Sequence, residues 1–120
     1  MKMDDNEKYE NLANAIIERA VDDYKAQARK LNYLKTHKFE VLQKIVQHES
    51  KKAHPIFYTG TELQAEYNRK VRAAKYKLMN IESFFGSPWY CILTNVDGKA
   101  LLQMLKEQIK EKDGIDCDLL

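Results

Sequence analysis

The chain has few of the residues that break up secondary structure, with only four glycines and two prolines among 120 residues. An all-β chain needs a turn about every 8–12 residues, and collagen-like or Pro-rich chains need far more of both types. Two cysteines, Cys91 and Cys117, are too few for a disulfide framework and predict a reducing compartment. No apolar run approaches the roughly 18–20 residues of a membrane span, and the acidic N-terminus does not resemble a signal peptide. These absences predict a soluble, cytoplasmic protein with no membrane partner.

The length and the balance of residue types indicate one small folded domain. The chain is 44% hydrophobic and 32% charged, which is enough apolar material for one core beneath a well-solvated surface. A chain of this length corresponds to one domain by size. We expect a single helical domain over residues 1–114 and a frayed C-terminal tail over residues 115–120.

Apolar residues recur at spacings of three and four through most of the chain, which is the period of an amphipathic helix. We predict helices over residues 4–35, 36–54, 61–85, 88–95 and 98–113. The third is the most regular, with apolar positions from Leu63 to Phe85. The sequence therefore predicts an all-α fold, a small helical bundle of about five helices in which the first and third are long antiparallel neighbours.

Capping residues support the expected helix boundaries in the first half of the chain. The pairs Asp4–Glu7 and Thr61–Gln64 have the spacing of a capping box, and Thr36 is a cap between the first two helices. Residues 55–60 separate the second and third helices, because a residue before proline is pushed out of the helical conformation. We expect this loop to turn its apolar side chains back onto the core: Ile56, Phe57 and Tyr58.

Stronger signals mark the helix ends in the second half. Gly86 is placed to end the third helix, and Ser87 followed by Pro88 is typical of an N-cap and a first helical residue. Asp97 is expected to cap the start of the last helix, and Asp113-Gly114 is expected to end it.

Charge is distributed unevenly along the chain. Residues 1–24 carry three basic against seven acidic residues, whereas residues 25–77 carry thirteen basic against four acidic ones. Such asymmetry indicates either a polyanionic partner or a lysine-rich helical surface that keeps the protein in solution. The sequence leaves both interpretations open.

The candidate binding residues come from this basic middle segment. If the C-terminal half of the first helix packs beside the third, its basic residues form one positive face with those of the third helix. Arg69 and Arg72 are expected to project away from the core. Such a face can hold phosphates or an acidic protein surface. The candidates are Arg29, Lys30, Lys35, Arg69, Lys70, Arg72, Lys75 and Lys77.

Aromatic residues cluster around the turn after the third helix. They are Phe84, Phe85, Trp89 and Tyr90. We expect them to form the core corner where three helices meet, because aromatic side chains carry much of the buried area in a small domain. Cys91 is interpreted as a small core residue in the same corner. The alternative is an exposed aromatic anchor for a partner.

Motifs for catalysis or cofactor binding are missing from the sequence. His48-Glu49 lacks the second histidine of a zinc-protease motif, because Lys52 stands in its place. A calcium loop with Gly98 at its sixth position would have Leu93 and Met104 where carboxylate ligands are required. The scattered glycines form no phosphate-binding loop. Acidic residues near the start of the first helix are expected to be solvated. We therefore expect no metal, no cofactor and no enzymatic activity.

Three segments resemble a known group of sequences. Residues 13–24 read Ala-Asn-Ala-Ile-Ile-Glu-Arg-Ala-Val-Asp-Asp-Tyr, residues 81–90 read Ile-Glu-Ser-Phe-Phe-Gly-Ser-Pro-Trp-Tyr, and residues 93–101 read Leu-Thr-Asn-Val-Asp-Gly-Lys-Ala-Leu. Together they resemble a family of small helical proteins from prophages and integrative elements of Firmicutes. Family members often carry Arg at the position of Gly86 and an acidic residue at that of Asn95. The resemblance implies a mobile-element setting and no particular mechanism.

The resemblance and the missing catalytic motifs lead to one expected function and two alternatives. We expect a non-catalytic binding protein of a phage or mobile element that occupies a surface of a host protein or ribonucleoprotein complex. An inhibitor of a host defence complex, of the anti-CRISPR type, would act in this way. The alternative is a nucleic-acid-binding accessory factor of element replication or regulation, and an enzyme is a weaker alternative. The small residues of the first helix leave a homodimer open.

Overall fold

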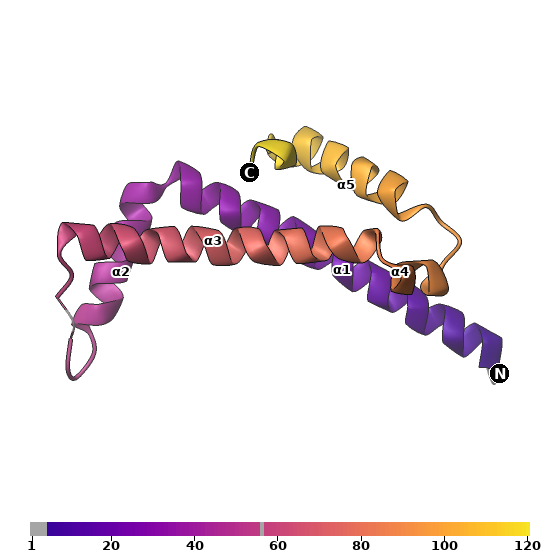
Figure 1. Ribbon diagram of the computed structural model, residues 1–120, viewed down its shortest axis with the longest axis horizontal. Helices are drawn as coiled ribbons and strands as arrows, with labels where there is room; N and C mark the ends of the chain where they lie inside the picture. Colours follow the sequence, from indigo (N-terminus) through magenta and orange to yellow (C-terminus); the bar gives the residue numbers. More distant parts are fainter. Residues whose placement is uncertain (1–4, 56) are drawn as a thin grey trace.

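A computed structural model describes residues 5–55 and 57–120 and confirms the predicted all-α fold. Its helices are α1 (Asp5–Thr36), α2 (Lys38–Ser50), α3 (Gly60–Phe85), α4 (Pro88–Leu93) and α5 (Gly98–Asp113), followed by a short 3₁₀ helix, η1 (Cys117–Leu119) (Figure 1). No strand occurs in the described part of the chain.

The two long helices α1 and α3 lie side by side and run in opposite directions (Figure 1). Two tyrosines fix their register. The Tyr67 hydroxyl donates to the Leu34 carbonyl oxygen at 2.6 Å, and the Tyr24 hydroxyl donates to a Glu82 carboxylate oxygen at 2.9 Å. Tyr67 near the start of α3 thus meets Leu34 near the end of α1. Glu82 near the end of α3 meets Tyr24, which precedes Leu34 on α1.

The molecule is elongated. Its principal extents are 59 × 33 × 25 Å and its radius of gyration is 19.0 Å, against about 14 Å for a compact domain of this length. Residues 5–12 of α1 are exposed and project past α4, while α2 turns aside at the opposite end (Figure 1). The two ends of the molecule are therefore built from different elements.

Most of the capping interactions in the second half are confirmed. The Ser87 side chain accepts from the Tyr90 backbone N–H, with Pro88 as the first helical residue. The Asp97 carboxylate accepts from two backbone N–H groups at the start of α5, and Gly114 ends α5 with a φ of 67°, in the left-handed region.

Three predicted boundaries in the first half need correction. The N-cap of α3 is Thr59, whose side chain accepts from the backbone N–H of Glu62, so the Thr61 capping box is wrong. Thr36 belongs to α1, because its hydroxyl donates to the Asn32 carbonyl oxygen. Helix α2 ends at Ser50, before the proline influences the chain. The predicted cap Asp4 lies outside the described residues.

A close approach of α5 to the end of α3 requires glycine at position 98. A Cβ atom on Gly98 would lie 1.8 Å from the Phe85 carbonyl oxygen and 2.9 Å from the Tyr90 ring. The Asp97-Gly98 pair therefore has two roles. Asp97 caps α5, and Gly98 allows the start of α5 to pack closely against the end of α3.

Residues 115–120, for which the sequence predicts a frayed tail, lie against the core in the structure. Gly114 reverses the chain at the end of α5, so that Ile115 and Cys117 return to the core and are buried. Lys106 of α5 pairs with Asp118 at 3.0 Å and holds η1 in place.

The aromatic corner is only partly a core, which corrects a second expectation. Phe85 and Tyr90 are buried, but Trp89 is 55% exposed and Cys91 is exposed. Helix α4 is only six residues long and turns one face inward, which Tyr90 occupies. Trp89 instead contacts the edge of Phe84, with ring centroids 5.8 Å apart.

The loop before α3 also differs from the expectation. Phe57 is exposed, whereas Tyr58 is half-buried against the core. Ile56 lies outside the described residues. Only one of the two described apolar side chains of this loop therefore turns inward as predicted.

Candidate anion-binding groove

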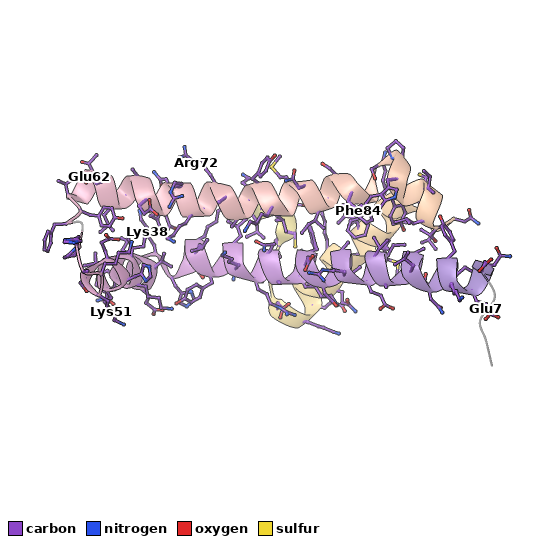
Figure 2. All side chains as sticks on the ribbon, turned by 90° about the horizontal axis from the view of Figure 1, so that it is seen from below. Glu7, Lys38, Lys51, Glu62, Arg72 and Phe84 are labelled. Carbon is purple, nitrogen blue, oxygen red and sulfur yellow. The ribbon has the colours of Figure 1, made fainter. Side chains whose placement is uncertain are left out.

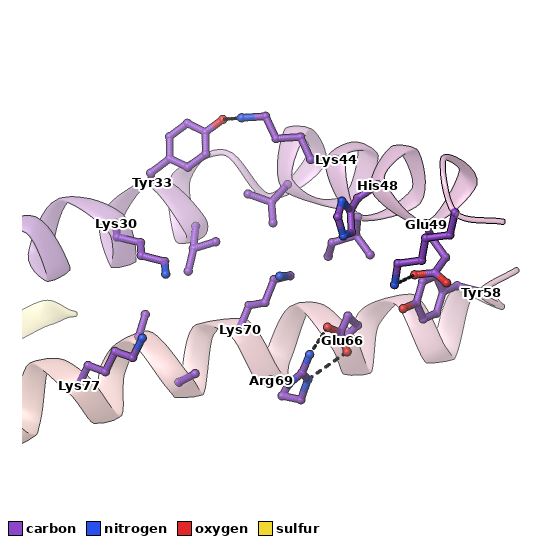
Figure 3. A pocket seen from close by; sticks show the side chains of 16 residues that line it. Lys30, Tyr33, Lys44, His48, Glu49, Tyr58, Glu66, Arg69, Lys70 and Lys77 are labelled. Carbon is purple, nitrogen blue, oxygen red and sulfur yellow. Dashed lines mark hydrogen bonds and ion pairs between the residues drawn. The ribbon is translucent and has the colours of Figure 1, made fainter. Parts of the chain in front are cut away.

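A groove of about 790 Å³ opens between the C-terminal part of α1, helix α2 and the N-terminal half of α3 (Figure 3). It exists because the chain turns between Thr36 and Lys38, so α2 leaves the line of α1. Its floor is apolar and includes Leu34, Val41 and Ile45, and the small side chains of Ala73 and Ala74 leave room on α3.

The walls of the groove are predominantly basic. Six lysine and arginine residues face two glutamates. The cations are Lys30, Lys44, Lys52, Arg69, Lys70 and Lys77, and the carboxylates are Glu49 and Glu66. The groove therefore carries a clear excess of positive charge.

Two of these cations are already bound to the two glutamates. Lys52 pairs with Glu49 at 2.8 Å, and Arg69 holds Glu66 through both carboxylate oxygens. The hydrogen bond from Arg69 holds the pKa of Glu66 below its usual value, and the bond to Glu49 raises the pKa of Lys52. Each pair joins one cation to one carboxylate, so neither supplies free charge to the groove.

Four lysines supply the excess charge. One of them, Lys44, is hydrogen-bonded to the Tyr33 hydroxyl, and the other three are Lys30, Lys70 and Lys77. Lys30 enters from α1, while Lys70 and Lys77 enter from the opposite wall on α3 (Figure 3). In the part of the chain that the structure describes, none of the three makes an ion pair or a side-chain hydrogen bond. An anion in the groove would gain their attraction without breaking an existing pair.

Lys44 and Tyr33 form a fixed element at the junction of α1 and α2. The Lys44 ammonium donates to the Tyr33 hydroxyl at 3.1 Å, which raises the pKa of Lys44. The Tyr33 hydroxyl donates to Glu40 at 3.1 Å, and its ring stacks on His37 with centroids 4.6 Å apart. The Tyr33 ring is therefore held in place beside the basic walls.

The structure brings together four of the eight predicted site residues and separates the rest. Lys30, Arg69, Lys70 and Lys77 line the groove. The others do not: Arg29 pairs with Asp113 of α5 at 3.1 Å, Lys35 donates to the Leu120 carbonyl oxygen at 2.6 Å, and Arg72 and Lys75 are exposed outside the groove.

Helical geometry explains this division. Successive residues of a helix are rotated by about 100°, so Arg29 and Lys30 point to different sides of α1. Helix α5 occupies the side of Arg29, and α2 and α3 occupy the side of Lys30. The expected single positive face is therefore divided into a groove and separate surface charges.

Sequence reasoning missed the contribution of α2 and the segment after it. Lys44, His48 and Lys52 are spaced four residues apart, a pattern that places side chains on one face of a helix. That spacing was the available signal. Tyr33 and Tyr58 carry no comparable signal, because their place in the groove depends on how α2 packs on α3.

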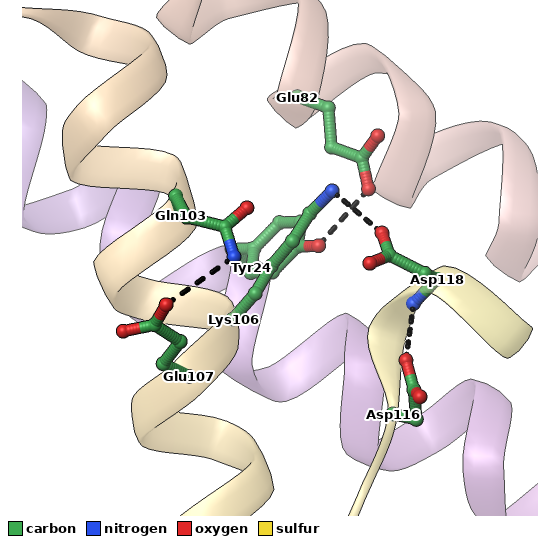
Figure 4. Close-up of polar contacts among 7 residues, drawn as sticks. All are labelled: Tyr24, Glu82, Gln103, Lys106, Glu107, Asp116 and Asp118. Carbon is green, nitrogen blue, oxygen red and sulfur yellow. Dashed lines mark hydrogen bonds and ion pairs between the residues drawn. The ribbon is translucent and has the colours of Figure 1, made fainter.

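A second polar cluster joins α1, α3, α5 and η1, and its role is structural (Figure 4). The Tyr24 hydroxyl contacts Glu82, while Lys106 contacts Asp118. Burial raises the pKa of Tyr24 and that of the Cys117 thiol close to it. Both groups thus stay protonated at neutral pH, and the cluster ties the C-terminal segment to the long helices.

The remaining observations bear on other classes of site. Over residues 5–55 and 57–120, no group of three His, Cys, Asp or Glu side chains is placed to hold a metal ion. None of the described helices is both long and apolar enough to cross a membrane. No family model, curated protein or solved structure matches the chain.

Proposed function

We propose that the protein is a non-catalytic binding protein and that its basic groove takes an anionic surface of a partner macromolecule. The observation that carries this proposal is the set of three lysines on two facing walls, Lys30, Lys70 and Lys77, none of which forms an ion pair with a described residue. Bringing unpaired cations together costs electrostatic energy, which a bound anion would recover.

The resemblance to proteins of prophages and integrative elements suggests the setting. In that setting the partner is a host protein or ribonucleoprotein complex in the bacterial cytoplasm. The protein would act by occupying a surface of that complex, as an inhibitor of a host defence complex of the anti-CRISPR type does. A groove with charged walls and an apolar floor suits such a contact, because the charges steer the encounter and the floor stabilises the complex.

Affinity purification from a host that carries the element tests this proposal. Wild-type protein should retain its partner, and a variant with Lys30→Gln, Lys70→Gln and Lys77→Gln should lose most of it. The matched control replaces three exposed lysines of α5, Lys99, Lys110 and Lys112, by glutamine. Equal recovery of the partner by wild type and the groove variant would contradict the proposal.

A nucleic-acid-binding accessory factor is the second candidate function, and the tyrosines of the groove favour it. Tyr33 and Tyr58 are half-buried and lie among the lysines. Proteins that bind single strands combine a positive groove with aromatic rings on which bases stack.

Fluorescence anisotropy with a short single-stranded oligonucleotide tests this candidate on the purified protein. Binding should weaken steeply with salt, because phosphate contacts release counterions. It should also weaken in the groove variant and persist in the α5 control. Absence of binding at low salt would exclude direct nucleic-acid recognition and leave a protein partner.

A further inference from the structure

One histidine lines the basic groove. His48 is the only histidine among the described residues that border it, and Figure 3 shows its ring pointing from α2 into the groove. The residue is exposed, and within the described part of the chain its ring forms no hydrogen bond and no ion pair. The ring is therefore free to contact an anion that enters the groove.

The groups that border the groove around His48 come from all three helices and from the segment after α2. They are Lys30 and Tyr33 on α1, Lys44 and Glu49 on α2, Lys52 and Tyr58 after α2, and Glu66, Arg69, Lys70 and Lys77 on α3. The two carboxylates are bound to Lys52 and Arg69. Neither is free to neutralise a positive charge added at His48.

The acidic residues at the start of α1 do not face His48. Figure 2 places Glu7 at one end of the molecule and α2 at the other, where Lys38 and Lys51 mark the two ends of that helix. The charge that surrounds His48 is therefore that of the groove itself, in which lysine and arginine outnumber carboxylates.

Of the side-chain types in the groove, only imidazole ordinarily changes its charge between pH 6 and pH 8. Carboxylates ordinarily lose their proton below this range, and lysine, arginine and tyrosine lose theirs above it. Hydrogen bonds in the groove widen this separation, because they raise the pKa of Lys44 and Lys52 and lower the pKa of Glu66. A change in the charge of the groove over this range therefore involves His48.

We propose that protonation of His48 strengthens the binding of anions in the groove, so that the groove holds its ligand more tightly at acidic pH. A protonated imidazole adds one positive charge and a second N–H donor, and a bound anion in turn favours the charged form of the ring. Binding of the anion is then linked to uptake of a proton. This inference rests on the proposed function and adds a regulation of the same groove by pH.

Isothermal titration calorimetry with an oligo-aspartate peptide tests the inference on the purified full chain. Wild type should bind about fivefold more tightly at pH 6 than at pH 8, because one added charge acts on the ligand. The aspartates of the peptide stay ionised at both pH values. Titrations in buffers of different ionisation enthalpy should show that binding takes up protons. Added salt should reduce the difference, because His48 is exposed.

Three variants assign the pH dependence to one residue. His48→Gln should bind equally at both pH values and take up no protons. His54→Gln is the matched control, since His54 is exposed and lies outside the groove, and it should keep the wild-type pH dependence. His48→Lys carries a positive charge throughout this range and should bind at pH 8 about as tightly as wild type does at pH 6.

Each outcome decides for or against the inference. Equal affinity of wild type at the two pH values overturns it and leaves the proposed function intact. A pH dependence that persists in His48→Gln, or disappears in His54→Gln, also overturns it, since the proton would then bind elsewhere. Absence of binding at both pH values contradicts the proposed function as well. Melting by circular dichroism monitors folding, and if His48→Gln fails to fold, His48→Lys provides the comparison.

Discussion

Gly98 stands where two helices touch through backbone atoms, and a single added carbon there would meet the Phe85 carbonyl oxygen at 1.8 Å. We predict that Gly98→Ala lowers the free energy of unfolding by about 3 kcal/mol, because the start of α5 must move away from α3. Gly60→Ala is the control, since a Cβ there has nothing within 4 Å. Thermal melts of the two variants should therefore differ widely, and equal melts would contradict the close approach.

Trp89 and Phe85 belong to the same aromatic cluster but differ in burial. Phe85 is buried, and Phe85→Ala should cost about 3–5 kcal/mol of unfolding free energy. Trp89 is more than half exposed, so Trp89→Ala should cost about 1 kcal/mol or less. Urea denaturation measures both changes. A larger loss for the tryptophan variant would show that this residue belongs to the core after all.

The Glu66–Arg69 pair predicts a pH dependence. Because the pKa of Glu66 in the folded protein lies below its unfolded value, the pair contributes stability at pH above the usual glutamate value of about 4.3. This contribution is lost as the pH falls through the lowered pKa. An NMR titration of the Glu66 carboxyl in wild type and Arg69→Gln should show a higher pKa in the variant. The same pKa in both would mean that the pair does not form in solution.

At the scale of elements, local signals determined most of what the sequence predicts correctly. Helical spacing identified all five helices, and Ser87 and Asp97 cap them as expected, because caps depend on neighbouring residues alone. The N-cap of α3 was predicted at the wrong residue, because both Thr59 and Thr61 are suitable capping residues at this end of the helix. In the structure it is the Thr59 hydroxyl that accepts from the free backbone N–H of Glu62.

What the sequence could not predict depends on angles between helices. Lys30 lines the groove and Arg29 does not, because α5 and α2 approach α1 from different sides. Likewise the inward turn of Ile115 and Cys117 follows from the left-handed Gly114, which reverses the chain onto an existing core. The neighbouring Gly114 indicates that the chain turns, but the surface onto which it turns depends on how α5 packs against the long helices.

The folded C-terminal element makes the two cysteines chemically different. Cys91 is exposed on α4, whereas Cys117 is buried on η1, where burial raises the pKa of its thiol. A thiol reagent at neutral pH should therefore modify one thiol rapidly and the other slowly in the native protein. Cys91→Ser should remove the fast phase only. Two fast phases would mean that residues 115–120 are detached, as a frayed tail would be.

At the scale of the whole molecule, charge and shape are arranged along one axis. The acidic start of α1 projects at one end of the 59 Å rod, and the basic groove opens near the other. We expect the groove to bind anions through Lys30, Lys70 and Lys77, which form no ion pair with any described residue.

An NMR titration with a short polyanion, either an oligo-aspartate peptide or a single-stranded oligonucleotide, tests whether the groove is the anion-binding site. The largest shifts should occur at Lys30, Lys70 and Lys77. Arg72 and Lys75, which are equally basic but lie outside the groove, should change little. Shifts centred on Arg72 and Lys75, or spread evenly over all basic residues, would contradict it.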